Sequence, residues 1–84
     1  MKIILFGSSC ELCRELAYKI EHVIMSKNLP TEFEKSNDIK YMLSYGIQST
    51  PSIVINEQIA SISKDLTYEE IETLIHHYIN INKY

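Results

Sequence analysis

Hydrophobic and polar residues follow one another in patterns that predict an alternation of strands and helices. Residues 2–6 form a run rich in β-branched and aromatic residues before Gly7-Ser8-Ser9, which predicts a strand buried on both faces. Beyond Cys10, apolar residues recur at helical spacing with charged residues opposite, which predicts an amphipathic helix that ends near Asn28. Leu29-Pro30 then breaks this helix.

The middle of the chain predicts a short strand, a short helix and a hairpin. Residues 31–35 alternate weakly between apolar and polar, as a strand does. Ser36-Asn37-Asp38 offers an N-cap for a helix that begins near Ile39, and Gly46 supplies the left-handed residue that ends it. Residues 52–55 and 59–62 indicate two strands joined by a turn.

The last part of the chain predicts a third helix. Thr67-Tyr68-Glu69-Glu70 is a capping box, and the apolar residues after it share one helical stripe. The predicted order is therefore β-α-β-α-β-β-α. With 84 residues the chain has no material for a second core, so we expect one domain over residues 1–84.

Charge and hydropathy then narrow the class of protein. The net charge is −3 and the basic residues are scattered singly, which argues against nucleic-acid binding. The longest apolar run, residues 3–6, is too short for a membrane span or a signal peptide core. From these features we expect a soluble, cytoplasmic monomer that does not bind membranes.

The two cysteines carry the first chemical clue. Cys10 and Cys13 are three residues apart, and in a reducing compartment this spacing is typical of redox or metal-binding sites. Cys10 lies where a buried strand gives way to a helix, so the free N–H groups and helix dipole favour its thiolate. We expect Cys10 to leave the helical path as the nucleophile, with Cys13 the more buried, resolving thiol.

Thr50-Pro51 is a second candidate feature of the site when it is considered together with the two cysteines. Proline at the first position of a strand is ordinary by itself. However, a cis peptide here would set a bare backbone edge opposite Cys10, where a substrate strand could pair with it.

Two segments of the chain resemble the thioredoxin/glutaredoxin superfamily, above all its compact prokaryotic thioredoxin-like proteins. They are residues 10–13, Cys-Glu-Leu-Cys, and residues 45–56, Tyr-Gly-Ile-Gln-Ser-Thr-Pro-Ser-Ile-Val-Ile-Asn. The resemblance spans nearly the whole chain. It implies an α/β thioredoxin fold with a central four-stranded mixed sheet flanked by helices. It also implies that Cys10 attacks, Cys13 resolves, Pro51 is the cis-proline, and Thr50 and Leu12 contact the substrate.

The chain departs from the familiar thioredoxin pattern in three ways. No Trp precedes Cys10, Glu11-Leu12 replaces Gly-Pro, and strand two offers no obvious acidic residue behind Cys13. Because thiolate stabilisation sets the potential of a dithiol, these departures leave the redox potential and direction open.

The leading hypothesis is a thiol-disulfide oxidoreductase that acts on protein disulfides, with no cofactor besides its own disulfide, and that an external reductant resets. Glutathione use stays open, with Arg14 and Lys40 as the basic candidates. The alternative is a copper(I) carrier that binds the metal through the same two thiolates. A regulatory domain whose disulfide reports redox state is a third possibility.

Other candidate groups have plainer interpretations. The three histidines, His22, His76 and His77, lie off the apolar stripes, so we expect them at the surface rather than on zinc. Tyr45 is the one tyrosine for which the sequence suggests a role, as a ring that approaches the groove near Thr50.

Overall fold

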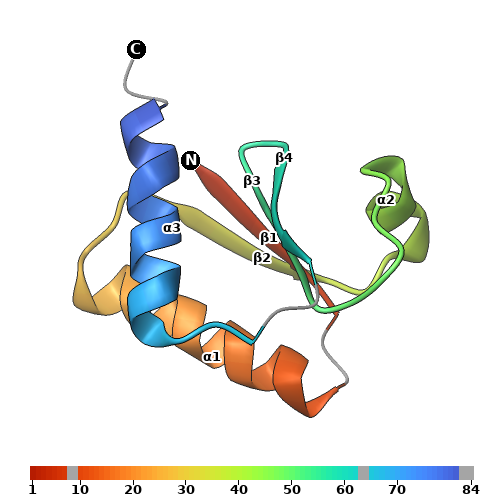
Figure 1. The fold of residues 1–84 in the computed structure, drawn as a ribbon, viewed down its shortest axis with the longest axis horizontal. Coiled ribbons are helices and arrows are strands. Elements are labelled where there is room, and N and C mark those ends of the chain that lie inside the picture. Colours follow the sequence, from red (N-terminus) through yellow and green to blue (C-terminus); the bar gives the residue numbers. More distant parts are fainter. Residues whose placement is uncertain (8–9, 63–64, 82–84) are drawn as a thin grey trace.

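Seven helices and strands lie in the part of the chain that the computed structural model describes, residues 1–7, 10–62 and 65–81. They are β1 (Lys2–Phe6), α1 (Glu11–Ser26), β2 (Glu32–Ser36), α2 (Ile39–Ser44), β3 (Ser52–Ile55), β4 (Gln58–Ile62) and α3 (Tyr68–Ile81) (Figure 1). The predicted order is confirmed, with β2 displaced by one residue and β4 one residue longer. Ser8 and Ser9, the predicted end of the first strand, lie outside the described residues.

The four strands form the expected mixed sheet, and their order in it is β2-β1-β3-β4. β1 runs parallel to β2 and antiparallel to β3, and β3 and β4 form the predicted hairpin. Asn56 and Glu57, at the turn of this hairpin, both have positive φ, the conformation of a tight two-residue turn. β1 is central and its residues 3–6 are all buried, which explains its continuous apolar run.

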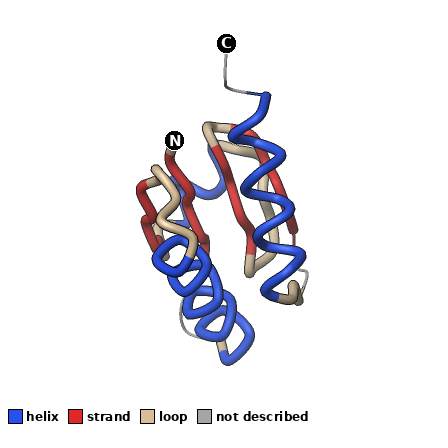
Figure 2. The backbone as a smooth tube through the Cα atoms, turned by 90° about the vertical axis from the view of Figure 1, so that its left-hand side faces the viewer, coloured by secondary structure: helices blue, strands red, loops and turns tan. Residues whose placement is uncertain are grey.

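The sheet carries a thick layer on one face and a thin one on the other. α1 and α3 pack on the first face, which can be followed in Figure 2, and enclose the larger core. The buried residues of this core are Ile3, Leu5, Leu16, Ala17, Ile20, Val23, Ile53, Ile55, Leu66, Ile71, Ile75 and Tyr78. α2 lies on the second face, where the buried cluster is Ile4, Phe6, Ile47 and Val54.

Side chains and backbone close the helix ends as the sequence predicts. The Asp38 carboxylate accepts the N–H of Tyr41 at the start of α2. Thr67 and Glu70 form the capping box before α3, each accepting the other's N–H. Gly46, with φ +80°, follows α2 in the left-handed conformation. Among the described residues, no helix combines the length and the apolar character that a membrane crossing requires.

Candidate functional site

Three strands meet at one end of the sheet and create the floor of the candidate site. The last residue of β1, Phe6, pairs with Ser36 at the end of β2 and with Ser52 at the start of β3. Gly7 continues this pairing, because its N–H donates to the Ser36 carbonyl at 2.9 Å. The loops that follow β1 and β2 and the loop that precedes β3 therefore gather at the same end of the sheet, where an α/β sheet commonly binds its ligands.

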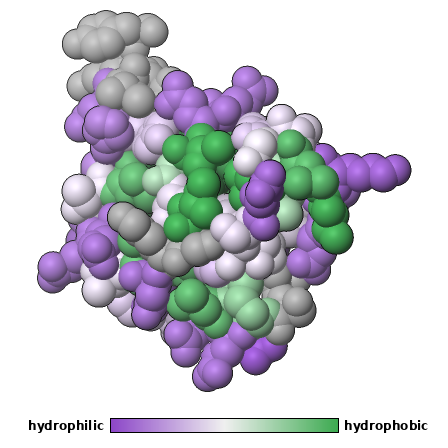
Figure 3. Space-filling view, turned by 45° about the vertical axis from the view of Figure 1, so that its right-hand side comes forward, coloured by the Kyte–Doolittle hydropathy of each residue, from purple (hydrophilic) through white to green (hydrophobic). Residues whose placement is uncertain are grey.

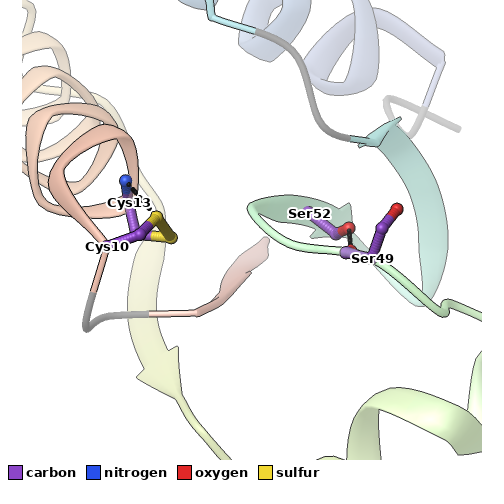
Figure 4. The surroundings of a disulfide bond; sticks show 4 residues. All are labelled: Cys10, Cys13, Ser49 and Ser52. Carbon is purple, nitrogen blue, oxygen red and sulfur yellow. Dashed lines mark hydrogen bonds between the residues drawn. A yellow bond between two sulfur atoms is a disulfide. The ribbon is translucent and has the colours of Figure 1, made fainter.

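A disulfide between Cys10 and Cys13 stands at this end, at the beginning of α1 (Figure 4). Their Cα atoms are 5.1 Å apart. Cys10 is the N-cap, with extended backbone (φ −89°, ψ 158°), so it leaves the helical path as expected. Cys10 is exposed, whereas Cys13 is only 1% exposed and faces the core. The pair thus has one sulfur accessible to a partner and one shielded from it.

The backbone of α1 also forms a hydrogen bond to the sulfur of the exposed Cys10. The N–H of Cys13 donates to the Cys10 Sγ, with 3.0 Å between nitrogen and sulfur. In the reduced protein this N–H, at the positive end of the helix, is a ready donor to a Cys10 thiolate. Glu11 is the acidic residue of the first turn and opposes that charge, because it follows Cys10 directly.

The loop before β3 lies across the end of β1 from the disulfide (Figure 4). Its Thr50-Pro51 peptide bond is cis. Thr50 is exposed and Pro51 is buried. The hydroxyl of Ser52, a fully buried residue, donates to the carbonyl of Ser49 and so closes the loop on itself. Sequence reasoning did not single out Ser52, because a serine at the start of a strand gives no signal of its burial.

Gly7 joins the loop to the disulfide, and sequence reasoning also missed its role. It has φ +102°, and a Cβ there would lie 2.9 Å from the Thr50 Cβ and 3.0 Å from the Cys13 Sγ. A side chain at this position would therefore collide with both halves of the site. The available signal was a glycine between a buried strand and the Cys-x-x-Cys motif.

The site contains little buried charge. Ser52 is the one buried polar or charged side chain among the described residues, so these place no buried carboxylate beside Cys13. The two acidic residues of β2, Glu32 and Glu34, are not buried. The charged side chains nearest the disulfide along α1, Glu11, Arg14 and Glu15, are all exposed.

Other predicted residues lie beside or away from this centre. Leu12 is half-buried and packs against the larger core next to the disulfide. Lys40 is exposed on α2. The three histidines are exposed, and the described residues contain no group of three or more metal-binding side chains.

The structure places Tyr45 elsewhere than the sequence suggested. Its ring packs on Phe6 and Tyr41, and it lines a hollow with Lys2 and Asn56 rather than the Thr50 loop. A hydrogen bond to Tyr41, together with burial, raises the pKa of Tyr45 above its ordinary value. Tyr41 and Tyr45 lie four residues apart around α2 and so share one face, which turns Tyr45 toward the sheet.

Comparison with known proteins agrees with this geometry. The thioredoxin domain family matches residues 1–76, and the chain belongs to this family. A thioredoxin from Methanothermobacter thermautotrophicus is 23% identical over 75 residues, which is 89% of this chain and 97% of that protein.

Solved structures show the same fold. Thioredoxin 1 from the thermophilic eubacterium Thermosipho africanus superposes with a TM-score of 0.69 at 19% identity, over all of both chains. A structure described as that of a malarial protein gives a TM-score of 0.71 at 12% identity, over 93% of this chain and 96% of the other. The family and the Cys10–Cys13 disulfide together support a thiol-disulfide oxidoreductase in general terms.

Proposed function

We propose that the protein reduces disulfide bonds in partner proteins through the Cys10–Cys13 dithiol. The observation that carries this proposal is the asymmetry of the pair. One sulfur is exposed at a helix start with an N–H donor on it, and the other is buried within disulfide distance. This arrangement suits an attacking thiolate and a resolving thiol.

The reaction has two exchange steps. The Cys10 thiolate attacks one sulfur of the partner's disulfide, a mixed disulfide forms, and the partner's other sulfur leaves as a thiolate. The Cys13 thiol then loses its proton to solvent and attacks the Cys10 sulfur, which closes Cys10–Cys13 and releases the partner's second thiolate. Two electrons pass from the dithiol to the partner, and an external dithiol or glutathione must return them.

The partner segment is proposed to lie between the disulfide and the Thr50-Pro51 loop. Thr50 is exposed there and close to Gly7, so its backbone is available to an extended segment. Leu12 offers apolar contact on the other side of the exposed sulfur. A cytoplasmic location is proposed with this role, because reducing compartments keep such dithiols in their active form.

The copper(I) alternative gains no support from the fold. It assumed the order β-α-β-β-α-β, whereas here α2 stands between β2 and β3 and the chain belongs to the thioredoxin domain family.

Cysteine substitutions test the two roles. The chain has two cysteines, so each single variant keeps one thiol and any adduct has one possible position. Cys10→Ser is expected to lower dithiothreitol-dependent reduction of insulin by at least roughly a hundredfold, because the nucleophile is lost. Cys13→Ser is expected to accumulate a mixed disulfide with insulin, visible by intact mass. Full activity of Cys10→Ser would contradict the assignment of the nucleophile, and no trapped adduct on Cys13→Ser would contradict the resolving role.

A further inference from the structure

The outer edge of β4 is open to further strand pairing. β4 stands last in the strand order β2-β1-β3-β4, and within residues 1–7, 10–62 and 65–81 no strand pairs with its outer side. An edge strand presents backbone N–H and C=O groups that can pair with another extended chain. Figure 1 shows β4 on the right-hand side of the sheet, and Figure 3, which turns that side forward, shows apolar side chains open to solvent.

The two edges of the sheet differ in their protection against such pairing. β2, at the other edge, carries the charged residues Glu32, Glu34 and Lys35. Glu34 forms an ion pair with Lys2 at 2.9 Å, and Lys35 forms one with Glu21 at 3.5 Å. The sequence of β4, Gln-Ile-Ala-Ser-Ile, contains no charged residue. Because charged side chains are a common defence of edge strands, β4 lacks a protection that β2 has.

A bulge in β4 determines which of its side chains lie on each face of the sheet. Ile59 pairs with Val54, a residue of the buried cluster on the α2 side. Ser61 pairs with Ile53, a residue of the larger core on the α3 side. Ala60 is the extra residue between them, and it also packs against the larger core. Since residues directly opposite each other share a face, the bulge places two small side chains, Ala60 and Ser61, next to each other on the α3 side.

A hollow of about 590 Å³ lies between β4 and α3, beside these two small residues. We name it the β4–α3 hollow. Two leucines also line it, of which Leu66 is buried and Leu74 is half-buried. Glu69 and Glu70 border it at the start of α3, and His77 lies further along this helix. The described residues that line the hollow include no lysine or arginine, so its floor is apolar and its border is acidic.

We propose that β4 and the β4–α3 hollow bind an extended segment of a partner protein that has an apolar side chain in the hollow and a lysine or arginine beside Glu69. The backbone of this segment pairs with the open edge of β4 as a fifth strand. Alternate side chains of a strand point to opposite faces, so one set enters the hollow and the other lies against Ile59, which is 42% exposed. The inference stands apart from the proposed function, because β3 lies between β4 and β1, the strand that leads to the disulfide.

The charges favour such a partner over a second copy of this chain. Antiparallel pairing of β4 with β4 of another copy would give one joined sheet with both α3 helices on the same face. Glu69 and Glu70 of the two copies would then border one common groove, where like charges repel. β4 also brings no basic residue to either border. A segment with apolar and basic residues avoids this repulsion.

The test selects binders from a displayed library of random peptides of about ten residues, the length of one long strand. The library contains no cysteine, and the full chain is used in its disulfide form, so no peptide is captured covalently. We expect the enriched peptides to alternate apolar, β-branched residues with others and to carry a lysine or arginine. The Kd of the most enriched peptide is then measured by fluorescence anisotropy. A selection that enriches no peptide of this pattern would overturn the inference.

Two pairs of variants locate the binding surface. Ile59→Glu places a charge beside the open edge of β4, and Ile39→Glu places the same charge on α2, at a residue that is 67% exposed. Both positions are exposed, so both variants keep the fold. Ile59→Glu is expected to raise the Kd at least about tenfold. Ile39→Glu is expected to leave it at the wild-type value, and equal effects of the two variants would overturn the inference.

The second pair tests the charge at the border of the hollow. Glu69→Lys is expected to raise the Kd about three- to tenfold, and a peptide with glutamate in place of its basic residue is expected to bind this variant more tightly than it binds the wild type. Glu32→Lys makes the same change on β2 and is expected to alter neither value. A Glu69→Lys variant that still prefers the basic peptide would contradict the proposed contact.

Two further measurements separate the other outcomes. Saturating peptide is expected to leave the reduction of bis(2-hydroxyethyl) disulfide unchanged, and competition with this reaction would place the peptide at the disulfide and overturn the inference. The free chain is expected to sediment as a monomer. A dimer that Ile59→Glu dissociates would make a second copy the occupant and overturn the inference as well. A wild type that binds the peptide at β4 but reduces no disulfide would contradict the proposed function alone.

Discussion

The two faces of the sheet differ in how firmly their helices are held. On one face, α1 has five buried residues, Cys13, Leu16, Ala17, Ile20 and Val23, and the last four share the larger core with residues of β1, β3 and α3. On the other face, α2 has no buried residue, and Tyr41 and Met42 are only half-buried. The thick face therefore supplies most of the hydrophobic stability and fixes the resolving cysteine, whereas the thin face leaves apolar surface open beside the disulfide. Regions of low local stability are where proteins commonly place surfaces that bind partners.

The largest expected effect compares the same substitution on the two faces. Leu16→Ala, at a residue 1% exposed in the larger core, is expected to lower the free energy of unfolding by about 2–5 kcal/mol. Leu43→Ala, at a residue 52% exposed on α2, is expected to change it by less than about 0.5 kcal/mol. Urea denaturation measures both. Equal losses in the two variants would show that the faces do not differ as described.

The two glycines give the next comparison, because both have positive φ and differ in their surroundings. Gly46→Ala meets no atom within 4 Å, so its cost is the left-handed backbone alone, about 1–2 kcal/mol. Gly7→Ala adds the collision with Thr50 and Cys13, so we expect a larger loss of stability and a reduction in insulin reductase activity of about tenfold.

Stability by denaturation and activity by insulin reduction are measured on both glycine variants. Gly46→Ala is the control, because it lies outside the candidate site. If the two variants lose activity equally, Gly7 has no special position between the loop and the disulfide.

A smaller effect is expected at the serine that closes the Thr50-Pro51 loop. Ser52 and Ser44 each donate a hydroxyl hydrogen bond to the carbonyl three residues earlier, but Ser52 is buried in the site and Ser44 is exposed on α2. Ser52→Ala is expected to cost about 1 kcal/mol and to raise the KM for a protein disulfide several-fold, because the loop loses its internal bond. Ser44→Ala is expected to change neither.

The alkylation rate of reduced Cys10 separates a positioning role of Ser52 from a general loss of structure. If Ser52 only positions the Thr50-Pro51 loop, the alkylation rate of Cys10 in Ser52→Ala is expected to equal that of the wild type. A changed alkylation rate with an unchanged KM would contradict the role given to Ser52.

The smallest effect concerns charge at the start of α1. Glu11→Gln removes the negative charge next to Cys10, so more of Cys10 is thiolate at neutral pH, and alkylation by iodoacetamide is expected to be about two- to threefold faster. Glu15→Gln, one turn further along the same exposed helix surface, is the control and is expected to change the rate less. A slower reaction of Glu11→Gln would show that Glu11 supports the thiolate rather than opposing it.

Local patterns were sufficient to predict the order of the elements. The apolar run of β1, the capping box at Thr67 and the glycine after α2 each act over a few residues, so one sequence reveals them. The same holds for Cys10, since its place between a strand and a helix follows from its neighbours in the chain. The departure of Cys10 from the helical path and the greater burial of Cys13 were predicted on that basis and are confirmed.

Features that depend on contacts between distant segments of the chain could not be predicted from the sequence. Gly7 matters because Thr50 and Cys13 approach it from two other elements. Ser52 is buried because β1 and β4 flank it, and no local pattern records that. Tyr45 was placed near Thr50 because the two are close in sequence, but packing on Phe6 and Tyr41 determines where its ring lies.

The measurement that tests the central claim most directly is a redox titration of the metal-free protein. The protein is equilibrated in defined dithiol/disulfide buffers, free thiols are trapped with an alkylating reagent, and the thiols are counted by intact mass. The account predicts that Cys10 and Cys13 lose their thiols together, as one two-electron couple, within the range of about −270 to −120 mV found for exchange catalysts. Thiols that oxidise separately, or that pair only under harsh oxidation, would contradict an exchange dithiol at this site.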